Sequence, residues 1–332
     1  MIEIVFTVDY EIYGNGEGSL DELVVRPAEK LRDIFRKVNS RFVAFVEAAE
    51  LEVIEAQGTD SASDDVRSQI KSFHGEGFEI GLHLHPQWYN ARYEDGKWQL
   101  DYSEYNLCTL PPERIAQILD RSIQYLRSML GEGGFTPFSF RAGNWLLQPS
   151  EIVAKELDGH GIKVDSSVFK GGVQRKHGMD YRRAISNDYY WAFSDHVDIP
   201  DESGILLEIP TYTQMVPIWK MVTAKKVRMQ RNSYPSHGGG NNKMYRFLDF
   251  MRLWYPLKLD YCRMTLDQLI TMVDGVIRED RKDSARFRPI VAIGHTKDLI
   301  DYDTVQSFLS YLGQKGIKIS TFKDVYHRCG YR

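Results

Sequence analysis

Eight short apolar segments, separated by amphipathic helical patterns, constrain the fold of this chain more than any other feature. The segments are rich in Ile, Val and Phe and most end at Gly, Pro or polar residues, which is typical of buried parallel strands. They are Ile2–Val8, Phe42–Val46, Phe78–Leu84, Pro137–Arg141, Ile162–Val164, Ile205–Ile209, Pro289–Ile293 and Ile317–Ser320. The helical patterns are Pro27–Val38, Ser63–Gly75, Pro111–Leu130, Pro149–His160, Thr265–Arg278 and Tyr302–Gly313.

Strands that alternate with helices predict a parallel sheet with right-handed crossovers. Seven or eight such units favour an α/β fold of the (β/α)7-8 barrel type over an open sheet. We therefore expect residues 1–332 to form a single barrel domain, with one insertion at about 210–261. The loops that follow strands surround the active site of such a barrel, so the insertion is a candidate wall for a substrate.

Composition excludes several classes of protein. The three cysteines lie far apart and show no metal-binding or disulfide spacing, so we expect reduced, structural thiols. The first residues lack the pattern of a secretory signal, and no segment approaches the roughly 18 apolar residues of a membrane helix. These features favour a cytoplasmic protein. The net charge of −4 gives no general attraction to nucleic acid.

Two histidines, His83 and His85, end the third apolar segment. Side chains at i and i+2 of a strand project to the same face, so both imidazoles should face one way and Leu82 and Leu84 the other. Two imidazoles in this arrangement can bind one Zn²⁺ ion. The spacing alone is equally compatible with two structural histidines at a strand end.

Two acids, Asp9 and Glu11, stand at the end of the first segment with the same i, i+2 spacing. Neighbouring carboxylates repel each other as anions, and a cation beside them removes that repulsion. One carboxylate can then bind a metal ion while the other acts as a general base on water. Taken alone, the pair is more typical of solvated acids at a strand end.

Three further polar residues, Arg141, Asp165 and His295, follow apolar segments. They stand where barrel enzymes place catalytic groups, at the carboxyl ends of strands. Each has a simpler interpretation by itself, as a surface arginine, a helix-capping aspartate and a loop histidine. The occurrence of such residues at five strand ends of one chain favours a functional site.

The order of these five motifs resembles the polysaccharide deacetylases of carbohydrate esterase family 4 and their intracellular relatives. The resemblance extends over nearly the whole chain and implies a distorted, TIM-like barrel. Asp9 matches the general base of that family. Glu11 matches a ligand carboxylate that some relatives place one residue later, because Tyr10 occupies the usual ligand position. His83 and His85 match the two histidine ligands, although the family spaces them four residues apart.

The resemblance also implies the remaining roles. Arg141 would pair with the base, His295 would act as general acid, and Asp165 would orient His295. One divalent ion would be held by Glu11, His83 and His85, with Asp9 beside it. Zn²⁺ suits this ligand set best, and Ni²⁺, Co²⁺ and Fe²⁺ use the same ligands. The neighbouring residues that we expect to contact the substrate are Tyr10, Trp88, Asn144 and Trp145.

The function that the resemblance implies is metal-dependent removal of an N-acyl group from an amino sugar. A precursor in surface polysaccharide or glycolipid biosynthesis fits a cytoplasmic location. Two alternatives remain open. One is a metal-dependent hydrolase of a non-sugar amide or cyclic imide. The other is a sugar-binding barrel without activity, which the altered motifs around Tyr10 and His83 suggest.

The insertion carries an unusual charge. Between Ile218 and Lys258 there are nine lysines and arginines and a single acid, Asp249, with aromatic residues interleaved. Such a segment can bind a phosphate-bearing sugar or contact an anionic membrane surface from the periphery. The interpretation that we favour is a solvated helical excursion whose aromatic side chains pack on the barrel.

Overall fold

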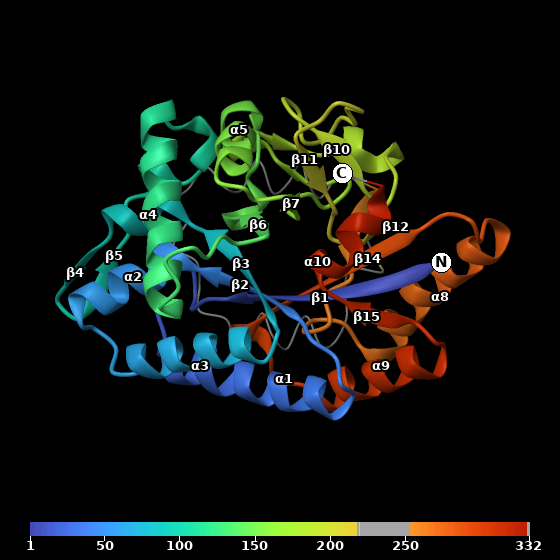
Figure 1. Cartoon of the computed structure of the whole chain (residues 1–332), viewed down its shortest axis with the longest axis horizontal. Helices are drawn as coiled ribbons and strands as arrows, with labels where there is room; N and C mark the ends of the chain where they lie inside the picture. Colours follow the sequence, from blue (N-terminus) through green and yellow to red (C-terminus); the bar gives the residue numbers. More distant parts are fainter. Residues whose placement is uncertain (218, 220–252, 331–332) are drawn as a thin grey trace.

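The computed structural model describes residues 1–217, 219 and 253–330, and its centre is a nine-stranded sheet (Figure 1). The strands of the sheet are β1 (Ile2–Tyr10), β2 (Val43–Glu47), β3 (Glu79–Leu84), β6 (Ser139–Ala142), β7 (Val164–Asp165), β10 (Trp191–Phe193), β11 (Leu206–Glu208), β14 (Arg288–His295) and β15 (Lys318–Ser320). Their order is β10-β11-β7-β6-β3-β2-β1-β14, and β15 also pairs with β1. All these pairs are parallel except β10–β11.

Helices surround the sheet, with α3, α1 and α9 along one side and α4 and α5 along another (Figure 1). The helices are α1 (Arg26–Lys37), α2 (Ala48–Gln57), α3 (Ser63–Gly75), α4 (Pro112–Leu130), α5 (Glu151–Gly159), α8 (Leu266–Lys282), α9 (Tyr302–Gln314) and α10 (Phe322–Tyr326). A π-helical turn, Asp21–Val25, leads into α1, and 3-10 turns follow β3 (Pro86–Asn90), β6 (Gly143–Trp145) and β14 (Thr296–Asp298). In the described residues, no helix is both long and apolar enough to span a membrane.

The sheet curls until its two ends meet. Thr211, which follows β11, forms a parallel bridge with Val291 of β14, and the backbone N–H of Tyr212 donates to the Val291 carbonyl at 2.9 Å. Asp260 forms a second bridge, with Ile293. These single bridges close a distorted (β/α) barrel, which confirms the predicted fold class.

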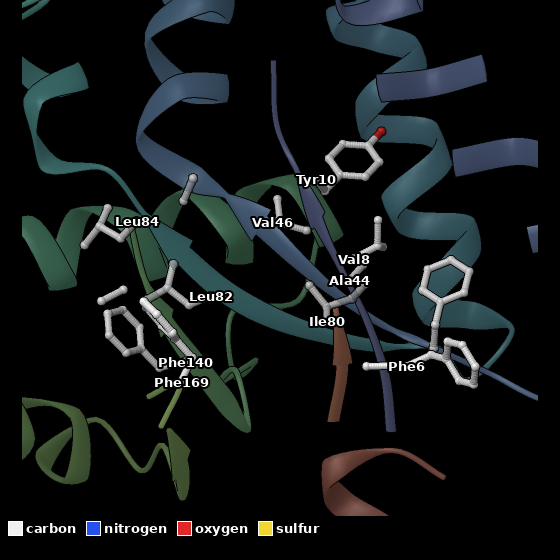
Figure 2. Packing of buried hydrophobic residues seen from close by; sticks show 14 of the residues in the cluster. Phe6, Val8, Tyr10, Ala44, Val46, Ile80, Leu82, Leu84, Phe140 and Phe169 are labelled. Atoms are coloured by element: carbon white, nitrogen blue, oxygen red, sulfur yellow. The ribbon is translucent and has the colours of Figure 1, made fainter. Parts of the chain in front are cut away.

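Alternation along the strands produces two layers of core. The outer core lies between strands and helices and includes Phe6, Val8 and Tyr10 of β1 (Figure 2). The inner core fills the barrel, and its members are Val5, Val43, Phe45, Val164, Leu207, Ile209, Val291, Phe322, Val325, Tyr326 and Cys329. Helix α10 contributes three of these side chains, and the backbone N–H of its Lys323 donates to Glu79 at the start of β3, so α10 covers the amino-terminal end of the barrel. The opposite end, where the strands finish, remains available for a site.

The two ends of the predicted insertion pair with each other. Strands β12 (Thr213–Pro217) and β13 (Trp254–Lys258) run antiparallel, with Thr213 opposite Lys258. The basic stretch that precedes Lys258 falls almost entirely at positions 218 and 220–252, outside the described residues. Two further antiparallel pairs lie in the loops, β4 (Arg92–Glu94) with β5 (Lys97–Gln99), and β8 (Val173–Gln174) with β9 (Met179–Asp180).

Candidate active site

The strand register brings the predicted motifs to one rim of the barrel. Asp9 stands opposite His295 in the β1–β14 pair, and His83 stands opposite Arg141 in the β3–β6 pair. The strands are parallel, so their carboxyl ends meet at the same edge and their inward side chains converge. His85 follows β3 at the same rim.

Glu11, His83 and His85 form a buried cluster whose ligand atoms lie within 4.8 Å of one another. Glu11 Oε2 lies 3.4 Å from His85 Nδ1 and 3.6 Å from His83 Nε2. His83 Nδ1 lies 2.8 Å from the Arg141 carbonyl oxygen, which assigns the ring proton to Nδ1 and leaves Nε2 free as a ligand. Two imidazole nitrogens and one carboxylate oxygen are a donor set that Zn²⁺ accepts, so these residues fit the predicted ion.

Lys297 orients the Glu11 carboxylate. Its Nζ donates to Glu11 Oε1 at 2.8 Å and to the Ile12 carbonyl at 2.9 Å, which turns Oε2 towards the histidines. Burial alone would raise the pKa of Glu11, but the charge of Lys297 and the two imidazoles bring it well below its ordinary value. Burial lowers the pKa of His85 to about 3. An ionised carboxylate and a neutral imidazole are the forms that bind metal ions.

Two buried glutamates support the backbone of this cluster. Glu47 accepts hydrogen bonds from the backbone N–H of His85 at 2.5 Å and from that of Glu50. Glu50 Oε1 accepts from the backbone N–H of Ile12 at 2.7 Å. Burial and the neighbouring carboxylate raise the pKa of Glu47 well above its usual value, and burial, with the Glu11 carboxylate, raises the pKa of Glu50 to about 8. The sequence analysis identified neither residue as part of the site.

Asp9 lies between Arg141 and His295. Arg141 Nη1 donates to Asp9 Oδ1 at 2.6 Å, and Asp9 Oδ2 lies 3.4 Å from His295 Nε2. Burial would raise the pKa of Asp9, but Arg141, His83 and His295 hold it below its ordinary value. The arginine–aspartate contact that the family resemblance implies is therefore present, and it keeps Asp9 ionised. Asp9 also belongs to a second group of ligand atoms, shared with Glu11 and His295.

Asp298, and not Asp165, lies beside His295. Asp298 Oδ2 is 3.7 Å from His295 Nδ1 and accepts a hydrogen bond from Arg263 Nη2 at 2.6 Å. Asp165 instead accepts from the backbone N–H and the hydroxyl of Ser167, at 3.0 and 2.6 Å. The prediction that Asp165 orients His295 is wrong, because β7 pairs with β6 and β11 and is no neighbour of β14. Asp298 is only three residues after His295, and this short spacing could have indicated it as the partner of the histidine.

Two of the expected substrate contacts point away from the rim. Tyr10 is fully buried in the outer core, and its hydroxyl donates to Gln69 Oε1 at 2.8 Å (Figure 2). Trp88 is also buried there, with its ring centroid 5.3 Å from that of Trp98. The expectation that these side chains contact a substrate is therefore corrected. Tyr10 follows the strand alternation, which turns it opposite to Asp9 and Glu11.

Asn144 and Trp145 do lie at the rim. The Trp145 ring centroid is 6.3 Å from that of His295. Both residues have positive φ angles, 55° and 60°, which are rare for residues other than glycine. The turn is held by Gln174, whose amide donates to the Asn144 carbonyl at 2.8 Å, and by Tyr181, whose hydroxyl donates to the Trp145 carbonyl at 2.6 Å. Such backbone conformations persist where the surrounding contacts over-determine them.

Gly143 leaves room for His85. A Cβ atom at position 143 would lie 2.5 Å from His85 Cδ2 and 2.6 Å from the Leu84 carbonyl oxygen. We expect Gly143→Ala to displace the imidazole and weaken metal binding about 10- to 100-fold, as loss of ligand orientation does elsewhere. Competition with a chromogenic chelator would measure the affinity. Gly133→Ala, with open space around the added methyl group, is the control, and equal affinities for both variants would contradict the argument.

Comparison with solved structures supports the fold, but no sequence comparison assigns the chain to a family. No family model matches the chain, and no curated protein matches it significantly. A proposed polysaccharide deacetylase from Mycobacterium smegmatis is 14% identical, with a TM-score of 0.54 over 98% of this chain and 89% of that one. An allantoinase is 12% identical, with a TM-score of 0.51 over 98% and 88%. A branching enzyme of the GH57 type from Pyrococcus horikoshii is 10% identical, with a TM-score of 0.55 over 98% and 70%. The chain thus has the fold of the polysaccharide deacetylases, as the order of its motifs predicted.

Proposed function

We propose that this chain is a metal-dependent hydrolase that removes an N-acyl group from an amino sugar. The observation that carries the proposal is the placement of the Asp9–His295 pair, 3.4 Å apart, directly beside the Glu11–His83–His85 cluster. A base and an acid next to a metal-binding set are the groups that amide hydrolysis needs. The deacetylase fold is consistent with this chemistry.

Glu11, His83 and His85 would hold the divalent ion. When bound there, the ion would polarise the acyl carbonyl and make a water molecule more acidic. Asp9 would accept the proton of the attacking water, because Arg141 keeps its carboxylate ionised and fixed. His295 Nε2 lies close enough to Asp9 to receive that proton and pass it to the leaving nitrogen. Asp298 at Nδ1 would stabilise the imidazolium that forms.

The position of Trp145 favours a sugar as substrate. Trp145 stands at the rim beside His295, where an indole face can contact a sugar ring. We propose an N-acetylated amino sugar that serves as a precursor in surface polysaccharide or glycolipid synthesis. The same catalytic groups would also open a cyclic amide, and the likeness to an allantoinase makes that the second candidate.

Acetate release and metal content test the proposal together. Purified protein should contain about one equivalent of a divalent metal, because the two groups of ligand atoms share Glu11. The double variant His83→Ala/His85→Ala should contain none. The parent should release acetate from N-acetylglucosamine, its oligomers or its nucleotide conjugate, and the variant should not.

The matched control for this experiment is His74→Ala/His160→Ala, which removes two histidines at ion pairs outside the cluster, with Glu132 and Asp120. This control should retain both metal and activity. Parent protein without metal after incubation with Zn²⁺ would refute the hydrolase mechanism. Cleavage of hydantoin but of no N-acetyl sugar would move the assignment to the second candidate.

A further inference from the structure

Lys258 places a positive charge at the rim, next to the proposed acid. It is the last residue of β13, and the following segment pairs with β14 through the Asp260–Ile293 bridge, close to His295. Its Nζ lies 3.3 Å from the centroid of the Trp145 ring and 4.6 Å from that of Phe169. The Trp145 ring therefore lies close to both the ammonium group and His295.

This ammonium group has no acidic partner among residues 1–217, 219 and 253–330, although it is half-buried. The two acids that act on Lys258 already have partners: Asp260 pairs with Arg263 at 3.8 Å and Asp9 with Arg141 at 2.6 Å. The aromatic contacts offset part of the lost hydration. A second donor belongs to the same indole ring: Nε1 of Trp145 is buried without an acceptor in the described part of the chain. A buried donor left unpaired is costly to a folded protein, and a bound ligand is one feature that removes this cost.

The charges around Lys258 do not neutralise its ammonium group. Burial lowers the pKa of Lys258 to about 7, and the charges of Arg263 and Arg141 add to that effect. The carboxylates of Asp260 and Asp9 raise it but do not compensate. An anion placed against Nζ would supply the missing charge and favour the protonated form.

We propose that Lys258 and the indole N–H of Trp145 form an anion subsite beside His295, and that the substrate is an N-acylated amino sugar bearing a phosphate or a carboxylate. This inference rests on the proposed function for the sugar part and on the two unpaired donors for the anion. A phosphate and a carboxylate both present oxygen acceptors to an ammonium group and an N–H donor. The subsite would bind the charged substituent while the acyl group lies at the cluster.

Calorimetric titration with three sugars tests the subsite. The ligands are N-acetylglucosamine 1-phosphate, N-acetylglucosaminuronic acid and neutral N-acetylglucosamine. We expect the metal-loaded protein to bind at least one anionic sugar about 10-fold more tightly than the neutral one, as a charge-assisted hydrogen bond predicts. Lys258→Met should bring this ratio close to one, and Lys258→Arg should restore part of it. The anionic sugar that shows the preference identifies phosphate or carboxylate as the recognised group.

Lys315→Met is the matched control, because Lys315 also lies over an aromatic ring, 5.5 Å from the Tyr311 centroid, but on the surface. It should retain the full preference. Equal binding of all three sugars by the parent, no binding of either anionic sugar, or an undiminished preference in Lys258→Met would overturn the proposal. Acetate release is measured separately, so a protein that shows the preference but hydrolyses nothing would refute the proposed function and leave the subsite standing.

Discussion

Replacement of Asp9 by asparagine is expected to reduce kcat/KM for acyl hydrolysis by about 10²- to 10⁴-fold, the usual contribution of a positioned general base. Asparagine has nearly the same shape and still offers Oδ1 to Arg141, but its amide cannot accept a proton from water. The Arg141 guanidinium would keep its other acceptors, the Thr7 hydroxyl at 3.0 Å and the Ser166 carbonyl at 3.0 Å. Circular dichroism and steady-state assays of acetate release would provide the comparison.

Metal analysis of the same variant separates two roles of Asp9. Asp9 Oδ2 lies 4.0 Å from His83 Nε2, and it shares a ligand group with Glu11 and His295. If Asp9 is the base, the variant should keep its metal while it loses activity. Loss of both would make Asp9 a ligand. The control is Asp158→Asn, which changes a surface acid of α5. A fully active Asp9→Asn enzyme would contradict the proposed mechanism.

The parts of the site that the sequence predicted are those set by strand alternation. Asp9 and Glu11 face the barrel interior together because they are two residues apart, and the same holds for His83 and His85. The family resemblance added the pairing of Arg141 with Asp9, a contact that spans 132 positions and that no local pattern specifies.

The errors have physical causes. Asp165 was matched by motif order, but order along the chain does not determine which strands are neighbours around a barrel. Tyr10 lies at a strand end between Asp9 and Glu11, yet the alternation that turns Glu11 inward turns Tyr10 outward. Trp88 was expected to contact the substrate, but burial of a large apolar side chain in a core stabilises the folded protein by roughly 1.5–3 kcal/mol or more.

Helix α2 shows why part of the site escaped prediction. Its apolar residues do not repeat on one face, because the helix is buried on several sides at once: Ala48, Ala49, Leu51, Val53 and Ile54 are all buried. Glu47 and Glu50 at its start therefore look like ordinary polar residues of a helix. Their place in the site depends on hydrogen bonds from the backbone N–H groups of His85 and Ile12, which only the folded chain brings to them.

Removal of the Arg141 side chain should have the largest effect on stability. Arg141 is fully buried, pairs with Asp9 at 2.6 Å and lies 4.2 Å from the Phe45 ring centroid. Arg141→Met fills a similar volume but leaves the buried Asp9 carboxylate without its main counter-charge. Breaking one partner of a buried ion pair costs about 3–5 kcal/mol. We expect a loss of this size in the free energy of unfolding, measured by urea denaturation.

The control for this variant is Arg121→Met. Arg121 also pairs with an acid, Glu52 at 3.0 Å, and lies 4.1 Å over the Tyr89 ring, but it is exposed to solvent. Exposed pairs contribute about 0–1 kcal/mol, so this variant should change little. Equal losses in the two variants would show that the Arg141–Asp9 pair stabilises the barrel no more than a surface contact does.

The pH dependence of the Arg141→Met variant provides an independent check. In the parent, the lowered pKa of Asp9 means that its contribution to stability is present above the unfolded pKa and is lost as the pH falls through the folded pKa. Without Arg141, burial dominates and should raise the pKa of Asp9, which reverses the sign. The variant should therefore recover stability relative to the parent as the pH is lowered, because a protonated Asp9 no longer needs a counter-charge. The double variant Arg141→Met/Asp9→Asn should be more stable than Arg141→Met at neutral pH for the same reason, and failure of both recoveries would mean that lost packing, not the unpaired charge, causes the destabilisation.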